Sequence, residues 1–423
     1  MEKIINRREE SSEHSSAATP MWETLETYAR EEIQRFVQRL LEEEVEELLG
    51  RKKSERRTGD SPLGYRNGYG KERRLALMNG TIRLKRPRVR DLDERFVSRV
   101  LPLFGRRTRE VTTLLPELYL HGLSLGDFEL ALRGLLGEGA PLSASSIQRL
   151  KAEWHAQYVA WRERDLSDLA LVYLWADGLY VKAGLEDTKA ALLVVMGALA
   201  DGRKVILAVE SGQRESSASW AAVLRELKRR GLRAPKLTIA DGHLGIWGAL
   251  REIYPESQEQ RCWNHKLRNV LDQVPEKAHA EVLAQLQGIA NAESRADAER
   301  AKRAFRLAQA KRLPKAVERL EHDWERMVSY YAFPKEHWRH LRTTNVVESP
   351  FDAVRLRTSA AKRFKRVENA TALIWRVLLV AEQRFRKLNS PQLCAAVFEG
   401  MLYQDGERRT ITDVSKPRKR AAA

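Results

Sequence analysis

Two strand-length apolar segments of the chain end in the same tripeptide, Ala-Asp-Gly. The segment 169–176 leads into Asp177, and the segment 237–240 leads into Asp241. A buried carboxylate is costly unless a cation or hydrogen bonds compensate its charge, and two neighbouring carboxylates repel each other. A divalent cation bound between them relieves this repulsion, and oxygen ligands select Mg²⁺ or Mn²⁺. The alternative is that each aspartate belongs to a turn, because Asp-Gly is a common turn dipeptide.

The segments around these aspartates predict a mixed α/β domain. Two further apolar runs, 190–200 and 204–209, follow the first one, and the segment 217–230 has the periodicity of a helix. Three strands, a helix and a fourth strand in this order are typical of an α/β fold with a mixed sheet. Residues 264–340 are rich in Lys, Glu and Ala and contain no strand-length apolar run. They predict an all-α insertion in the α/β domain.

A third acid, Glu348, follows this helical block. It stands three positions after Asn345, which is also the spacing of a capping box, where the glutamate serves the helix N-terminus. Pro350 suits the first turn of a helix, which allows a helix start as late as Ser349 with Glu348 just outside. Glu348 is therefore either a third metal ligand or a capping residue.

Cys262 and His265 have the spacing of two metal ligands, and His337 and His340 could complete a set of four for zinc. A single Cys-x-x-His pair is a weak indication of a metal site. A buried, hydrogen-bonded pair is the favoured interpretation, so zinc is not expected.

The charge of the chain points to a polyanionic partner. Lys and Arg number 75 against 58 Asp and Glu, a formal net charge of +17, and nucleic acid is the first candidate for such a partner. Residues 51–110 alone hold 19 basic and 7 acidic residues, which favours a nucleic-acid-binding surface over a solvated charge run. Residues 21–49 predict an amphipathic helix that packs on the rest of the chain or on a second copy.

Two predicted helices, 125–136 and 143–154, flank the glycine-containing segment 137–139. This pattern fits a helix-turn-helix, although many helical bundles share it. The second helix would turn Gln148, Arg149 and Lys151 outward.

These observations divide the chain into eight predicted parts. They are a disordered segment 1–20, an amphipathic helix 21–50, a basic DNA-binding region 51–110, a helical DNA-binding region 111–165, a core 166–263, an all-α insertion 264–340, the last part of the core 341–390 and a C-terminal tail 391–423.

Six motifs in order resemble the transposases of bacterial insertion sequences that are related to the Mutator transposases. The resemblance covers about Trp22 to Arg386 and rests on the motifs 65–69, 80–88, 177–182, 241–242, 262–265 and 343–349. Two departures are Gly178, where alanine is more usual, and Pro350-Phe351, where Leu-Asn is more usual. The second departure concerns where the helix starts.

The resemblance implies a ribonuclease-H-like catalytic core that is interrupted by the all-α insertion and preceded by the helical and basic DNA-binding regions. Asp177, Asp241 and Glu348 would then form an Asp-Asp-Glu triad that holds two Mg²⁺ or Mn²⁺ ions for phosphoryl transfer. The position of Cys262 accepts aspartate in this family, which speaks against zinc and for a structural or DNA-contacting role of Cys262 and His265.

The expected function is transposition, with the chain binding the terminal inverted repeats of an element and target DNA, cutting strands and joining them. The alternatives are a sequence-specific regulator with an inactive core and a ribonuclease-H-like nuclease without joining activity. We expect a homo-oligomer in the cytoplasm, associated with the nucleoid and not with a membrane. The longest apolar run is about half of the roughly 20 residues that span a bilayer.

Two groups of side chains would contact DNA. Base reading would fall to Gln148, Arg149 and Lys151. Phosphates would be held by a basic set before and after the core, namely Arg66, Lys85, Arg86, Arg88, Arg355, Arg357, Lys362, Arg363 and Lys365.

Overall fold

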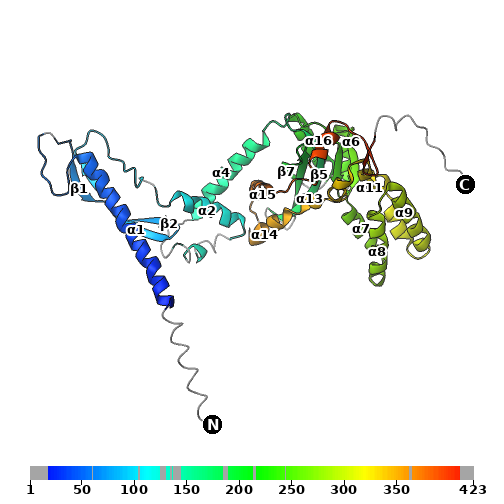
Figure 1. Cartoon of the computed structure of the whole chain (residues 1–423), viewed down its shortest axis with the longest axis horizontal. Coiled ribbons are helices and arrows are strands. Elements are labelled where there is room, and N and C mark those ends of the chain that lie inside the picture. The colour runs from blue at the N-terminus through cyan, green and yellow to red at the C-terminus, as the bar shows by residue number, and fades with distance from the viewer. Residues whose placement is uncertain are drawn as a thin grey trace, which may run out of the picture. The chain divides into compact units, whose positions relative to one another are not determined.

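The computed structural model describes residues 18–59, 61–102, 105–123, 130–133, 136, 144–183, 189–212, 216–242, 244–361 and 364–409. The chain divides into two compact units, residues 1–150 and 151–423 (Figure 1). Helix α4 (Ala144–Arg162) contributes residues to both units and is longer than the predicted helix 143–154. Most of the other predicted helix, 125–136, falls outside the described residues. The part of this range that is described, residues 130–133 and 136, is helical.

The N-terminal unit is built on helix α1 (Ala18–Leu49). Strand β1 (Tyr65–Tyr69) pairs with β4 (Pro87–Arg90), and β2 (Arg73–Leu77) pairs with β3 (Gly80–Leu84), both antiparallel. Helix α2 (Arg109–Leu120) follows. Leu41 of α1 packs against Ile82, Leu84 and Leu101. The amide of Gln38 both donates to the carbonyl of Lys85 and accepts from its N–H. The amphipathic helix thus packs on its own basic region, one of the two predicted outcomes.

The buried carboxylate of Glu44 fixes the segment after β4 onto α1. Glu44 is 8% exposed and accepts hydrogen bonds from the Ser98 hydroxyl and the Arg99 N–H, both at 2.5 Å. Replacing Glu44 by alanine leaves these donors without partners, which costs about 1–3 kcal/mol. We expect the Glu44→Ala variant to lower the urea midpoint of this unit. The exposed neighbour Glu43, whose carboxylate faces Arg39 at 3.7 Å, gives the matched control, and Glu43→Ala should shift the midpoint far less.

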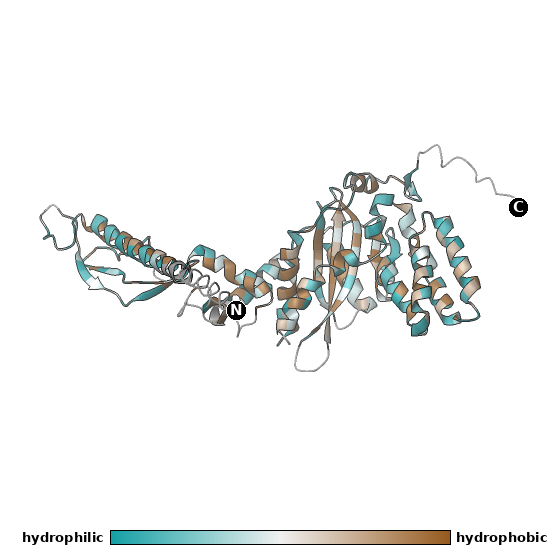
Figure 2. Cartoon of the chain, turned by 60° about the horizontal axis from the view of Figure 1, so that its bottom comes forward, coloured by the Kyte–Doolittle hydropathy of each residue, from teal (hydrophilic) through white to brown (hydrophobic). Residues whose placement is uncertain are grey.

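The second unit contains a five-stranded mixed sheet, in the order β7-β6-β5-β8-β9. Its strands are β5 (Leu171–Lys182), β6 (Lys189–Leu199), β7 (Lys204–Gly212), β8 (Leu237–Ala240) and β9 (Gln258–Arg261). Strand β6 is antiparallel to both β5 and β7, while β8 is parallel to β5 and β9 is parallel to β8. The predicted mixed α/β class is confirmed, and Figure 2 shows the hydrophobic residues concentrated along this sheet.

Strand β5 corrects one sequence expectation, because it does not end at Asp177. Its pairing with β6 continues through Asp177 and Gly178 to Lys182, whereas its parallel pairing with β8 stops where Ala176 faces Ala240. Asp177 therefore lies within a strand, at the point where the neighbouring strand β8 gives way to a loop.

Helices cover both faces of the sheet. Trp220 of α5 (Ser217–Arg229) and Trp247 of α6 (Leu244–Ile253) belong to one buried cluster with Leu174 and Val195. The strand periodicity of two turns Tyr173 and Trp175 to the opposite face, where the Trp175 indole N–H donates to the carbonyl of His340 at 3.0 Å. Asp177 shares this second face by the same alternation.

Every described element between β9 and residue 342 is helical. The longer ones are α7 (Trp263–Leu271), α8 (His279–Ala290), α9 (Arg295–Gln309) and α10 (Pro314–Glu321), and shorter turns include α11 (Trp324–Met327) and α12 (Trp338–Leu341). The chain then returns to the sheet through α13 (Asn345–Glu348), α14 (Phe351–Ala361), α15 (Val367–Glu382) and α16 (Gln392–Phe398), and ends in a hairpin of β10 (Tyr403–Gln404) and β11 (Glu407–Arg408). Among the described helices, none combines the length and apolar character that crossing a membrane requires.

Candidate active site

Asp241 and Glu348 meet at the side chain of His265. The Nδ1 atom of His265 lies 3.4 Å from Asp241 Oδ1 and 3.8 Å from Glu348 Oε1. Asp241 follows the last residue of β8, His265 lies in the first turn of α7, and Glu348 is the last residue of α13. The fold thus brings together two acids that stand on either side of the helical block.

Asp177 lies next to this pair along the sheet. Ala176 and Ala240 are partners in the parallel register of β5 and β8, so Asp177 and Asp241 each come one residue after paired positions. Neighbouring strands lie about 4.7–4.9 Å apart. One Asp177 carboxylate oxygen accepts the Gly178 N–H at 2.9 Å, and α13, which ends in Glu348, contacts β5. Asp177 and Asp241 therefore occupy neighbouring backbone positions where β8 ends, and the helix that bears Glu348 lies against β5.

Thr344 joins the Cys-x-x-His segment to the segment that bears Glu348. Its hydroxyl contacts Glu348 Oε1 and lies 3.2 Å from Cys262 Sγ, and its backbone N–H donates to the same sulfur at 3.3 Å. The thiol of Cys262 is fully buried, and burial raises its pKa, so it stays protonated at neutral pH. The Asn264 amide also donates to Asn345 at 2.9 Å. Cys262 and Thr344 hold α7 and α13 together, and with them His265 and Glu348.

The four-residue zinc set considered from the sequence does not assemble. His337 Nδ1 lies 2.9 Å from the Tyr173 hydroxyl, and its Nε2 lies 3.8 Å from Cys394 Sγ. Cys262, His265 and Glu348 do place one ligand atom each within 4.8 Å of one another.

The local backbone around Glu348 differs from both helix starts that were considered from the sequence. Helix α13 starts at Asn345 with Thr344 as its N-cap, and the Glu348 N–H donates to the Thr344 carbonyl at 3.0 Å. Asn345 is therefore inside the helix, and the Asn345–Glu348 capping box is not formed. No helix starts at Ser349 either. Glu348 lies within α13, and the next helix, α14, starts at Phe351, directly after Pro350.

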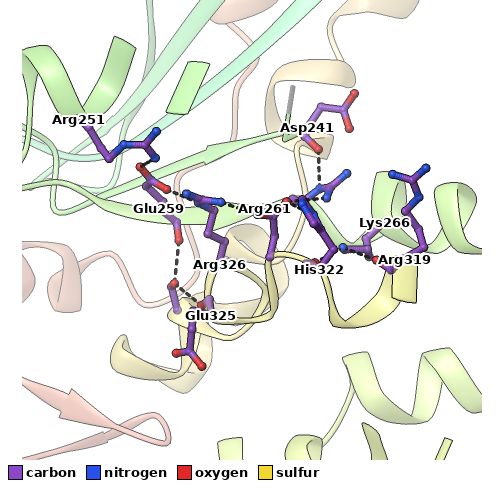
Figure 3. A network of polar contacts seen from close by, with 11 residues as sticks. Asp241, Arg251, Glu259, Arg261, Lys266, Arg319, His322, Glu325 and Arg326 are labelled. Atoms are coloured by element: carbon purple, nitrogen blue, oxygen red, sulfur yellow. Dashed lines mark hydrogen bonds and ion pairs between the residues drawn. The ribbon is translucent and has the colours of Figure 1, made fainter. Parts of the chain in front are cut away.

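A buried arginine fixes the loop that carries Asp241 (Figure 3). Arg261 donates from Nε to the backbone carbonyl of Asp241 at 3.1 Å and from Nη1 to Asp323 Oδ2 at 3.0 Å. Both side chains of the ion pair are 8% exposed. Gly242 lies against Arg261 with a φ of +98°, where a Cβ atom would overlap the arginine side chain. Arg261 thus connects the loop after β8 to the helical block.

The family model described as "Transposase, Mutator family" matches residues 6–387 of the chain. The chain belongs to this family. It is 45% identical over 308 residues to "Transposase for insertion sequence element IS6120" of Mycolicibacterium smegmatis, a match that covers 73% of this chain and 95% of the relative. It is 40% identical over 284 residues to "Transposase for insertion sequence element IST2" of Acidithiobacillus ferrooxidans. This match covers 67% of this chain and 96% of the relative.

One solved structure, the catalytic core domain of HTLV-2 integrase in complex with magnesium, matches 30% of this chain and 88% of its own length. The identity is 14% and the TM-score is 0.18.

Two of the DNA-contacting arginines expected for this Mutator-family chain are engaged in other roles. Arg66 pairs with Glu42 at 2.9 Å and with Glu46 at 3.4 Å, so its charge is neutralised by α1. Arg357 is 2% exposed, because it follows Phe351 and Val354 on the buried face of α14. A buried guanidinium does not present its charge at the surface, so the structure gives no support to the predicted DNA contact of Arg357.

The remaining expected contacts differ in their exposure. Arg355 pairs with Asp352 at 2.8 Å but stays exposed, Arg86 is half-buried, and Lys362 and Arg363 lie outside the described residues. The exposed members of the set are Lys85, Arg88, Gln148, Arg149, Lys151, Arg355 and Lys365.

Proposed function

We propose that the chain is a transposase that binds the terminal inverted repeats of an insertion element and catalyses metal-dependent cleavage and transfer of DNA strands. The reaction would take place at Asp177, Asp241 and Glu348. The observation that supports this proposal is the approach of Asp241 and Glu348 to one imidazole nitrogen, beside the strand that carries Asp177. Family membership and the excess of positive charge support DNA as the substrate.

The strand order and directions of the sheet suit a ribonuclease-H-like core. In this interpretation, the antiparallel strands β5, β6 and β7 come first, β8 and β9 extend the sheet on the other side of β5, and the helical block forms the insertion before Glu348.

The donor set of the site suits hard divalent cations. All three acids offer carboxylate oxygens, and the side chains of Asp241 and Glu348 are 28% and 30% exposed, so a phosphate oxygen could share a bound ion with them. A pair of Mg²⁺ or Mn²⁺ ions, when bound, would supply activation of the attacking oxygen and stabilisation of the leaving oxygen. His265 and Thr344 would orient the carboxylates.

A strand-transfer assay tests the proposed function against its two alternatives. The substrate is a supercoiled plasmid with both ends of the element, incubated with the chain and Mn²⁺ or Mg²⁺. A transposase produces nicked and joined DNA only with metal. Binding without cleavage would favour a DNA-binding regulator, and cleavage without joined products would favour a nuclease. Because two ends must be joined, we also expect the active form to be a homo-oligomer.

The exposed cations of the basic region predict a strong salt dependence of DNA binding. Removing one cation that binds a phosphate should reduce the slope of log affinity against log salt by about 1. We therefore expect Lys85→Ala and Arg88→Ala each to flatten the slope, measured by fluorescence anisotropy with element-end DNA. Arg303 on α9, equally exposed, gives the control, and Arg303→Ala should leave the slope unchanged. An equal effect of all three substitutions would argue against this surface.

A further inference from the structure

A polar pocket of about 580 Å³ opens beside Asp241. Its volume lies in the range of small-molecule sites, about 300–1,000 Å³. The start of α5, the loop after β8 and the helices α6, α7 and α10 all contribute to its wall, through residues that include Ser216, Gly242, Gly245, Asn269, Gln273 and Arg319. None of the expected site residues except Asp241 belongs to this pocket.

Two amides in the wall have no partner of their own. Asn269 lies in the last turn of α7 and Gln273 lies two residues after the helix ends, and both line the pocket. Both are half-buried, and neither side chain has a hydrogen-bond partner among the described residues. Their donors and acceptors are therefore available to a ligand in the pocket. A primary amide both donates and accepts, as does the edge of a nucleobase, and Asn and Gln pair with adenine in this way.

A cation completes the wall on the side of α10. The backbone carbonyl of Arg319 accepts a hydrogen bond from the buried Lys266 ammonium at 2.7 Å, which fixes the end of α10 (Figure 3). The Arg319 guanidinium itself is exposed and has no ion-pair partner in the described part of the chain. An arginine in this position can bind a phosphate with two hydrogen bonds. Asp272 is a second acid of the wall, but it is exposed at the rim.

We propose that this pocket holds one unstacked nucleotide of the DNA strand, next to the phosphate that is cut. Asn269 and Gln273 would bind the edge of its base, and Arg319 would bind its phosphate. Gly242 and Gly245 belong to the same wall, close to the loop of Asp241. The inference rests on the proposed function, because Asp241 then marks the position of the reacting phosphate. Taking a base out of the stack costs free energy, which the pocket contacts would offset.

Fluorescence of 2-aminopurine tests the unstacking without requiring cleavage. The probe is a duplex of the terminal base pairs of the element with 2-aminopurine at successive positions around the cut, mixed with the full chain in the absence of divalent metal. The fluorescence should rise several-fold at one position beside the cut. The double variant Asn269→Ala, Gln273→Ala should lose this rise while it keeps its affinity for the duplex within about threefold. Gln287→Ala, an exposed amide on α8 outside the pocket, should keep the rise.

An abasic nucleotide at the responsive position separates a base contact from a general defect of folding or catalysis. The double variant should cleave intact DNA about 10-fold or more slowly than the unmodified chain, but both should cleave the abasic duplex at equal rates. Arg319→Ala should slow the cleavage of both duplexes. Equal slowing of both duplexes by the amide variant would overturn the base contact.

The two proposals fail in different ways in this experiment. A chain that binds and cleaves the duplex with no 2-aminopurine response at any position contradicts the nucleotide pocket alone. A chain that neither binds nor cleaves the duplex contradicts the proposed function, and the pocket with it.

Discussion

Replacing Asp177, Asp241 or Glu348 by alanine is expected to abolish strand cleavage and strand transfer while DNA binding and folding survive. Each substitution removes a carboxylate that would hold a divalent ion, and such ions stabilise the transition state by several kcal/mol. Since about 1.4 kcal/mol corresponds to tenfold in rate, we expect a loss of at least about 10³-fold for each variant, measured as joined product per unit time with Mn²⁺ and Mg²⁺.

The matched control for this series is Asp168→Asn, which alters an exposed aspartate shortly before β5 and should retain full activity. Thermal midpoints and the affinity for element-end DNA should be the same in all four variants. Appreciable strand transfer by any one of the three alanine variants would remove that residue from the triad.

Replacing Arg261 by methionine is expected to destabilise the second unit and displace the loop of Asp241. The substitution leaves the Asp241 carbonyl without its donor and removes one cation from the buried carboxylate of Asp323. Breaking a buried ion pair costs about 3–5 kcal/mol, and we expect the lower end of this range because Arg326 still pairs with Asp323 at 2.5 Å. Urea unfolding followed by tryptophan fluorescence measures the loss.

Arg251→Met is the control for the Arg261 prediction. Arg251 pairs with Glu259 at 3.3 Å but is 59% exposed (Figure 3), and an exposed pair contributes at most about 1 kcal/mol. Combining Arg261→Met with Asp323→Asn should destabilise the unit by less than the sum of the two single effects, because both substitutions break the same ion pair. Equal destabilisation by the two arginine substitutions would mean that Arg261 does not anchor the loop.

Most of the sheet and the two aspartates of the candidate site, Asp177 and Asp241, could be predicted because their signals are local in the sequence. The apolar runs that lie within β5, β6, β7 and β8 end at polar or glycine residues, so each run is delimited within the sequence itself. Strand β5 continues past the end of its run to Lys182. Strand β9 gave no such signal, since its sequence Gln-Glu-Gln-Arg is polar. It forms because its residues pair in parallel with β8 and because the Gln260 amide finds the Met327 carbonyl at 3.2 Å.

The side-chain partners that decide which cations are available could not be predicted. Arg66 and Arg88 look alike in a basic stretch, yet only Arg66 faces the acidic residues of α1. Arg357 is buried because it follows Phe351 and Val354 at a spacing of three residues on the inner face of α14. This spacing is visible in the sequence. Arg261 and Thr344 act through contacts with residues more than 60 positions away, and no spacing rule connects such pairs.

A crystal structure of the chain with element-end DNA and Mn²⁺ tests the central claim most directly, because the anomalous signal of manganese locates each ion. The account predicts two manganese positions, both bound by oxygen atoms from Asp177, Asp241 and Glu348. Manganese bound elsewhere, or three carboxylates that share no ion in the DNA complex, would contradict it.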